Sequence, residues 1–228
     1  MLISIITILV LIISAIFHEY AHGWVAYKLG DHTAKDAGRL TLNPLAHLDP
    51  IGSVILPLLL VLSRASFIIG WAKPVPYNPY NLRDQKFGDL KVAMGGPGTN
   101  LFIALLFGLI ARFLPLTASL KTSLVINFFS GNNDLLLASL SGSLLTSIFV
   151  LSIIFCFINL LLMIFNLIPV PPLDGSKVLL SIMTPKWQLK YHQLEMYGFF
   201  ILIFLIYIGI FNFIFPLVLS IFSLIVGV

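Results

Sequence analysis

The chain has 228 residues, of which 59% are hydrophobic and only 10% are charged. Soluble domains average about 45–50% apolar and about 25% charged residues, so a water-soluble core cannot accommodate this composition. An ordinary soluble protein is therefore excluded, and we expect no nucleic-acid partner. We predict a single membrane-embedded domain over residues 1–228, in which the placement of positive residues matters more than the formal net charge of +4.

Four apolar segments are long enough to cross a bilayer as helices, because a span needs about 20 residues. They lie at 2–27, 92–116, 144–168 and 196–226. A fifth segment, 51–70, is interrupted by Pro57 and Arg64, and is predicted to be a span, a hairpin or a re-entrant helix. The predicted fold class is an all-α polytopic membrane protein with about four transmembrane helices plus this additional segment.

The distribution of positive residues predicts the orientation of the spans. The first segment has no basic residue before its apolar run and no small-residue cleavage site, so we expect it to be a retained span rather than a signal peptide. Eleven of the thirteen Lys and Arg residues lie in 28–91 or 177–190. The positive-inside rule therefore places these stretches in the cytoplasm and both termini outside.

The end of the first apolar segment carries the motif HEYAH, formed by His18, Glu19 and His22. Histidines four residues apart project from the same face of a helix, where two imidazoles can bind one zinc ion. Glu19 is close enough to act as general base on a metal-held water without being a ligand. The alternative is a structural His–Glu–His cluster, but ionisable residues at membrane depth are costly and usually functional.

A catalytic zinc usually has three protein ligands, and Asp174 is our candidate for the third. It lies in NLIPVPPLDG, residues 166–175, on the same predicted side of the membrane as HEYAH. The three prolines of this stretch predict an extended, rigid segment that lines a cavity. Taken alone, Asp174 would be an Asp-Gly turn; together with HEYAH on the same side, a ligand is the better interpretation.

These motifs resemble those of the site-2 protease family, the M50 intramembrane metallopeptidases. HEYAH and the distant NLIPVPPLDG carry the resemblance. Three weaker stretches, 38–50 (GRLTLNPLAHLDP), 70–79 (GWAKPVPYNP) and 95–100 (GGPGTN), are similar to the short prokaryotic branch and occur in the expected order.

The resemblance implies one zinc ion per chain, bound by His18, His22 and Asp174, with Glu19 as the base. It also implies that Asn166 lies near the reacting carbonyl and that the active site lies in the prokaryotic cell membrane towards the cytoplasm. Substrates would be single-span membrane proteins within the lipid bilayer. Many family members carry a PDZ or a cystathionine-synthase-type domain, and this chain has room for neither, so we expect gating by the membrane domain or by a regulatory membrane partner.

Several other polar residues are open to two interpretations. Asn166 is either a helix-packing amide or a hydrogen-bond donor to substrate. GGPGTN lacks the pattern of a phosphate-binding loop and is interpreted as a close-packing motif, with Asn100 facing the site. His47 is either a locally bonded loop histidine, or a group that supports the metal ligands or is an additional ligand in a resting state. Together with Asn100 and Pro169, it is also a candidate for substrate binding. The extended segment around Pro169 is a candidate for contact with a substrate strand.

Two other function classes remain open from the sequence. A catalytically silent relative would act as a membrane scaffold or chaperone. A metal transporter would use the His and Asp residues to carry ions, but the sequence has no sign of paired inverted halves with broken helices. The zinc protease is the function that the motifs favour.

Overall fold

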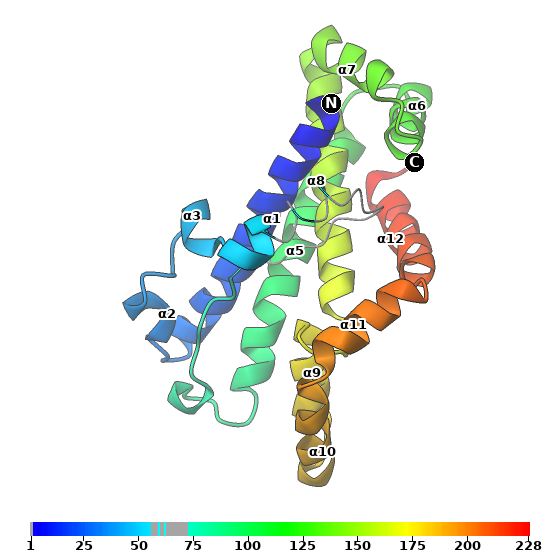
Figure 1. Ribbon diagram of the computed structural model, residues 1–228. Coiled ribbons are helices and arrows are strands. Elements are labelled where there is room, and N and C mark those ends of the chain that lie inside the picture. The colour runs from blue at the N-terminus through cyan, green and yellow to red at the C-terminus, as the bar shows by residue number, and fades with distance from the viewer. Residues whose placement is uncertain (1, 56–58, 60–61, 63–72) are drawn as a thin grey trace. The chain divides into compact units, whose positions relative to one another are not determined.

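A computed structural model describes residues 2–55, 59, 62 and 73–228, and these residues contain helices and loops but no strand (Figure 1). This confirms the predicted all-α class. The main helices are α1 (Leu2–Lys28), α5 (Gly88–Phe113), α6 (Ala118–Phe129), α7 (Asn133–Gly142), α8 (Leu144–Asn166), α9 (Asp174–Ile182), α10 (Pro185–Glu195), α11 (Gly198–Tyr207) and α12 (Phe211–Val226). Shorter elements are α2 (Thr33–Asp36), α3 (Pro44–His47), a π-helix η1 (Pro50–Ile55) and a 3-10 helix η2 (Pro79–Asn81).

Three described helices, α1, α5 and α8, are long and apolar enough to cross a membrane. They correspond to the predicted spans at 2–27, 92–116 and 144–168. Helix α5 begins four residues earlier than predicted, at Gly88, so the GGPGTN motif lies inside the helix and Pro97 is an interior residue. The chain is therefore a multi-pass membrane protein.

The predicted span at 196–226 is not one helix, and this part of the prediction was wrong. It forms α11 and α12, separated by a break in which Gly209 has φ +87°. A left-handed residue of this kind ends a helix, and glycine adopts it without steric cost. Helix α11 instead follows α10 after a short break, with a bend of 72° between the two helices; together they are apolar and long enough to form one bent span. The predicted fifth segment, 51–70, lies largely outside the described residues, which include only 51–55, 59 and 62 of it.

The chain divides into two compact units, and α1 and α5 contribute residues to both. The apolar unit comprises residues 1–14 and 97–228, and the HEYAH unit comprises residues 15–96. Each unit is described separately below. The single-domain assignment for residues 1–228 stays a prediction.

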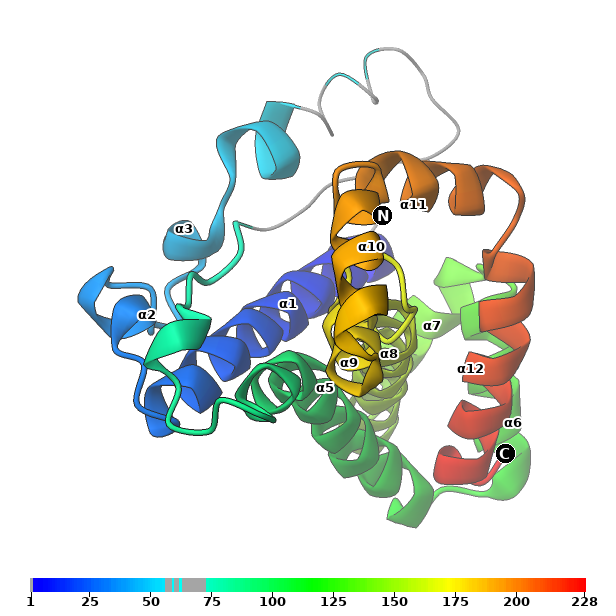
Figure 2. The same cartoon turned by 90° about the horizontal axis from the view of Figure 1, so that it is seen from below.

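The core of the apolar unit is built around α8, which contacts both α7 and α12 (Figure 1). Phe222 of α12 is fully buried. Its ring meets the ring of Phe129 edge to face at 5.5 Å, where α6 lies beside α12 in Figure 2, and that of Phe157 at 6.3 Å. Aromatic edge contacts of this kind add to the energy of area burial. The apolar unit is held together mainly by side-chain packing.

One polar chain runs through the otherwise apolar unit. The Asn159 amide donates to Ser14 Oγ at 2.8 Å, and the Asn100 amide donates to Asn159 Oδ1 at 2.8 Å. All three side chains are 0% exposed. Because each residue comes from a different apolar helix, these bonds fix the mutual register of α1, α5 and α8 within the unit.

Among the described residues of the HEYAH unit, the buried apolar cluster is small and is formed by Ala26, Leu82 and Val92. Its loops are held instead by the buried carboxylate of Asp31. Its Oδ1 accepts from the Thr33 hydroxyl at 2.6 Å, while its Oδ2 accepts from the backbone N–H of Asn78 at 2.8 Å. Oδ1 also accepts from Asn81 Nδ2 at 2.9 Å, so one side chain connects the loop after α1 to the loop before α5.

Candidate metal centre

The two histidines of HEYAH lie one turn apart on α1 and converge. His18 Nε2 and His22 Nε2 are 3.1 Å apart, and the rings meet edge to face with centroids 4.7 Å apart. The side chains are 7% and 9% exposed. Spacing on the helix brings the two imidazoles together, as the sequence predicts.

A backbone carbonyl of α5 fixes the tautomer of His22. His22 Nδ1 lies 2.7 Å from Val92 O, which can only accept a hydrogen bond. Nδ1 must therefore carry the proton, which leaves the lone pair of Nε2 directed at the shared space beside His18. This second contact of a ligating histidine is the arrangement usual at metal centres, where it orients the ring.

Gly96 of α5 provides room for both imidazoles. A Cβ atom at this position would lie 2.4 Å from His22 Nε2 and 2.6 Å from His18 Nε2. Gly95 allows a similarly close approach, because its Cβ would lie 3.1 Å from Ala21 O. The close-packing interpretation of GGPGTN is therefore confirmed for these two glycines.

This geometry fits a zinc ion. Zn–N bonds of about 2.0–2.1 Å at a tetrahedral angle place two ligand nitrogens about 3.3 Å apart. The observed Nε2–Nε2 separation of 3.1 Å is close to that value. Gly96 has no side chain to occupy the space beside the two Nε2 atoms, where an added Cβ would lie.

Glu19 points to a different neighbour from the histidines. Its Oε2 accepts a hydrogen bond from the backbone N–H of Val75 at 3.0 Å. Val75 is buried and lies between Pro74 and Pro76, which have no N–H to offer. The carboxylate therefore takes the donor that this stretch supplies, and one of its oxygens is fixed relative to α1.

Asp174 belongs to the apolar unit, where it is the first residue of α9. The preceding stretch is not extended as predicted. It forms successive turns, with Val170 N donating to Ile168 O and Leu173 N to Val170 O. Prolines exclude α-helix here, but turns satisfy the remaining backbone groups. A carboxylate in the first helical turn is stabilised by the helix dipole. The assignment of Asp174 as a ligand stays a prediction.

The other predicted site residues have local partners. Asn166 donates to Leu162 O at 2.9 Å within α8. Asn100 is fully buried and bonded to Asn159. His47 is 3% exposed, with Nε2 2.7 Å from Thr41 O. Pro169 O accepts from the Tyr191 hydroxyl at 2.8 Å. Their roles towards substrate stay predictions.

Sequence reasoning missed several residues that surround HEYAH. Val92 and Val75 act through backbone atoms, and no pattern of side chains identifies a backbone carbonyl or amide as a partner. Gly96 had a visible signal, because GGPGTN suggested close packing, but the sequence did not indicate which groups would approach it. Arg39 was counted only as a positive charge on the cytoplasmic side.

Comparison with known proteins agrees with the geometry. The model of "Peptidase family M50" matches residues 81–209. "Putative zinc metalloprotease YwhC" of Bacillus subtilis (strain 168) is 37% identical over 199 residues, which cover 85% of this chain and 76% of the relative. The chain belongs to peptidase family M50.

More distant M50 relatives are longer than this chain. "Putative zinc metalloprotease Rip2" of Mycolicibacterium smegmatis is 27% identical over 86% of this chain and 64% of its own length. Rip2 of Mycobacterium tuberculosis H37Rv is 25% identical over 78% of this chain and 57% of its own length. The chain thus spans less than two thirds of these relatives. No solved structure matches it.

Proposed function

We propose that this M50 peptidase is an intramembrane zinc metalloprotease that hydrolyses peptide bonds in or near the transmembrane segments of membrane proteins. The observation that carries the proposal is the convergence of His18 and His22 beside Glu19 at the end of an apolar helix. The names of the relatives YwhC and Rip2 support the same chemistry.

The proposed metal ligands are His18, His22 and Asp174, with one zinc ion per chain. Zinc supplies a Lewis acid and lowers the pKa of a bound water to about 7. His22 contributes the lone pair that its bond to Val92 leaves available. Asp174 contributes a carboxylate from the first residue of α9, directly after the turn-rich segment 167–173, in which Pro169 O accepts from the Tyr191 hydroxyl.

Glu19 is the proposed general base and acid. Its carboxylate takes a proton from the attacking water and returns it to the leaving amine. The Val75 amide holds Oε2, so the carboxylate does not need to search for its orientation during the reaction. Asn166 is the proposed donor to the developing oxyanion; to reach substrate, its amide must exchange the bond that it makes to Leu162 O.

The proposed substrates are single-span proteins, whose helices must unwind before an amide can be attacked. An unwound strand would pair with backbone in 38–50 or 70–80. The placement of eleven of thirteen positive residues in two stretches supports a site in the cell membrane towards the cytoplasm. A regulatory membrane partner is proposed to control access.

The test compares the wild-type chain with Glu19→Gln, which keeps both histidines and changes only the base. Purified protein in detergent is incubated with casein as an unfolded probe, and with a co-expressed single-span membrane protein in cells. We expect cleavage by the wild type, a loss of at least about 100-fold in the variant, and unchanged zinc content. Cleavage retained by Glu19→Gln would refute the proposal, and a wild type without activity would favour the silent scaffold.

The third ligand is tested by metal analysis of purified Asp174→Ala beside the wild type. A site reduced to two protein ligands holds zinc much less tightly. We expect about one zinc per wild-type chain and a substoichiometric amount in the variant. Full zinc content in Asp174→Ala would remove this residue from the site and leave the histidine pair in need of a different partner.

A further inference from the structure

The segment 73–75, which contacts Glu19, makes a hydrogen bond at each of its three residues. Lys73 N donates to His47 O at 2.9 Å. Lys73 O and Pro74 O both accept from Arg39 Nη2, at 2.7 and 3.4 Å. Val75 N then donates to Glu19 Oε2. The segment 73–75 therefore connects Arg39 to the base through a short stretch of backbone.

Arg39 is a buried cation in this position, 8% exposed. Its own backbone is anchored, since Arg39 N donates to Ala34 O at 2.9 Å beyond the end of α2. Among the described residues its guanidinium meets carbonyl oxygens and no carboxylate. Both bonds come from Nη2, and the bond to Lys73 O has the short length of a charge-assisted hydrogen bond. The buried guanidinium therefore holds the backbone of these two successive residues in place.

We propose that Arg39 is a positioning residue for peptide hydrolysis: by gripping the carbonyls of Lys73 and Pro74, it sets the Val75 N–H that orients the Glu19 carboxylate. This inference rests on the proposed function and assigns to that site a group that does not touch substrate. This role also accounts for a backbone N–H, rather than a side chain, as the donor to Glu19. Flanking prolines stiffen the segment and leave Val75 as the donor between them.

Two other functions of the segment can be distinguished from positioning. If it only stabilised the fold, weakening it would lower the amount of folded, zinc-loaded protein without changing the rate per zinc site. If it were a latch that blocks the base, weakening it would raise kcat. Positioning predicts a lower kcat at constant zinc content, with little change in KM, because substrate affinity does not depend on the orientation of Glu19.

The first experiment measures casein cleavage and zinc content for Arg39→Gln and Arg39→Lys in the full chain. Loss of the two bonds from Nη2 should lower kcat about 10- to 100-fold in Arg39→Gln, with KM within about threefold and zinc retained. Arg39→Lys keeps the charge but replaces the planar guanidinium by an ammonium group on a different stem, so its kcat should be intermediate. The matched control is Arg83→Gln, an exposed arginine of the same unit, which should cleave like the wild type.

A second pair of variants acts on the donor itself and does not depend on the folding of the Arg39 variants. Val75→Pro removes the N–H, whereas Val75→Ala keeps it and trims the side chain. We expect Val75→Pro to lose kcat as Arg39→Gln does, and Val75→Ala to retain most of it. Equal behaviour of the two Val75 variants, or a kcat per zinc that is unchanged or raised in Arg39→Gln, would overturn the inference.

The wild type and Glu19→Gln are measured alongside these variants. Without cleavage by the wild type, the proposed function fails, and the role of Arg39 fails with it. Cleavage that depends on Glu19 but not on Arg39 or the Val75 N–H leaves the protease proposal intact and refutes only the positioning role.

Discussion

The two compact units are stabilised in different ways. The apolar unit packs fully buried Phe, Ile and Leu side chains around α8. In the described part of the HEYAH unit the buried apolar cluster has three residues, and the buried polar groups Asp31 and Arg39 bind loop backbone. In water a hydrogen bond contributes only about 1 kcal/mol net, but an unsatisfied buried group costs more. We therefore expect the HEYAH unit to be more sensitive than the apolar unit to small displacements of its buried groups.

This difference matches the chemistry that the two regions carry. Packing by lipid-facing helices specifies which helices touch, but not the orientation of one carboxylate or one imidazole. Hydrogen bonds from Val92 and Val75 do specify those orientations. Four substitutions test the comparison, beginning with the one expected to have the largest effect.

Gly96→Ala should abolish the proposed metal centre. The added methyl would lie within 2.6 Å of both imidazole nitrogens, and the rings must separate to admit it. We expect loss of stoichiometric zinc and a fall in cleavage of at least about 100-fold. Gly98→Ala is the control, because its Cβ meets nothing within 4 Å. A Gly96→Ala protein that keeps zinc and activity would show that the two imidazoles can move apart without loss of the site.

Phe222→Ala should damage the apolar unit without changing the chemistry directly. Truncation of a fully buried phenylalanine costs about 3–5 kcal/mol in soluble cores, and Phe222 is 0% exposed. We expect a clearly lower midpoint of thermal unfolding in detergent, with zinc retained below that midpoint. Phe213→Ala, on the same helix but 77% exposed, should unfold nearly like the wild type. Similar losses in both would mean that burial in α12 is not what stabilises the unit.

Asp31→Asn should destabilise the HEYAH unit in a pH-dependent manner. Burial alone would raise the pKa of this carboxyl, but hydrogen bonds from Thr33, Asn78 and Asn81 outweigh it and hold the pKa below the ordinary 3.8. A depressed pKa means that the ionised form stabilises the fold above pH 3.8, and that this contribution is lost as the pH falls through the folded value.

The measurement compares thermal unfolding of wild type and Asp31→Asn across pH. We expect a gap of about 1–3 kcal/mol near pH 7, which narrows below pH 3.8. Asp36→Asn, an exposed carboxyl in α2, controls for a general loss of negative charge. A gap that stays constant down to the lowest pH would contradict an ionised Asp31 as the anchor of these loops.

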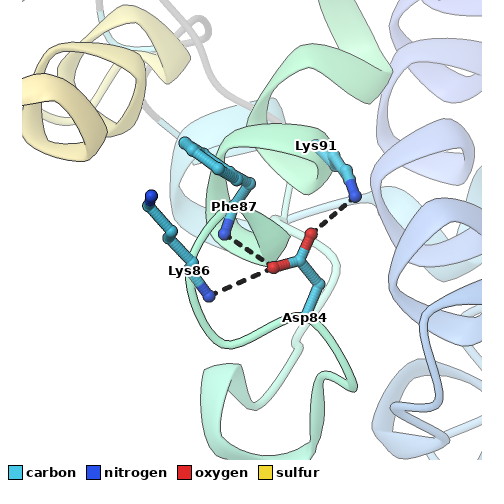
Figure 3. A network of polar contacts seen from close by, with 4 residues as sticks. All are labelled: Asp84, Lys86, Phe87 and Lys91. Atoms are coloured by element: carbon cyan, nitrogen blue, oxygen red, sulfur yellow. Dashed lines mark hydrogen bonds and ion pairs between the residues drawn. The ribbon is translucent and has the colours of Figure 1, made fainter.

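Asp84→Asn should have the smallest effect. Lys91 Nζ donates to Asp84 Oδ2 at 2.6 Å, and the other oxygen accepts from the backbone of Lys86 and Phe87 (Figure 3). The bond from Lys91, then that from Phe87, hold the pKa of Asp84 below its ordinary value. The network is open to solvent and screened by salt, so we expect little change in unfolding at 0.15 M salt. A loss as large as that of Asp31→Asn would erase the distinction between buried and exposed polar anchors.

The sequence predicted the elements that long apolar runs and fixed spacing determine. Three spans and the convergence of His18 and His22 follow from hydropathy and from helical periodicity. It failed at 196–226, because an apolar run shows membrane preference but not where a glycine such as Gly209 adopts left-handed φ and breaks the helix. The extended form expected before Asp174 failed similarly, since prolines exclude helix without choosing between strand and turn.

Contacts made by backbone atoms could not be predicted from the sequence. Nothing in the letters of Val75 or Val92 distinguishes them from other apolar residues, yet one amide and one carbonyl orient the base and a ligand candidate. Arg39 was visible only as charge. Its interaction with the 73–75 segment requires contact between two loops that are distant in the sequence, and hydrophobic periodicity gives no information about such a contact.

The bond between Val75 and Glu19 makes a single amide hydrogen a reporter of the proposed active site. In the stretch from Lys73 to Asn78, Pro74 and Pro76 contribute no exchangeable backbone hydrogen. Deuterium uptake by a short peptide from this stretch therefore reads out few sites, of which Val75 is the one bonded to the base. An inhibitor that draws Glu19 away would hasten isotope uptake there, so occupancy could be followed by mass spectrometry without any cleavable substrate.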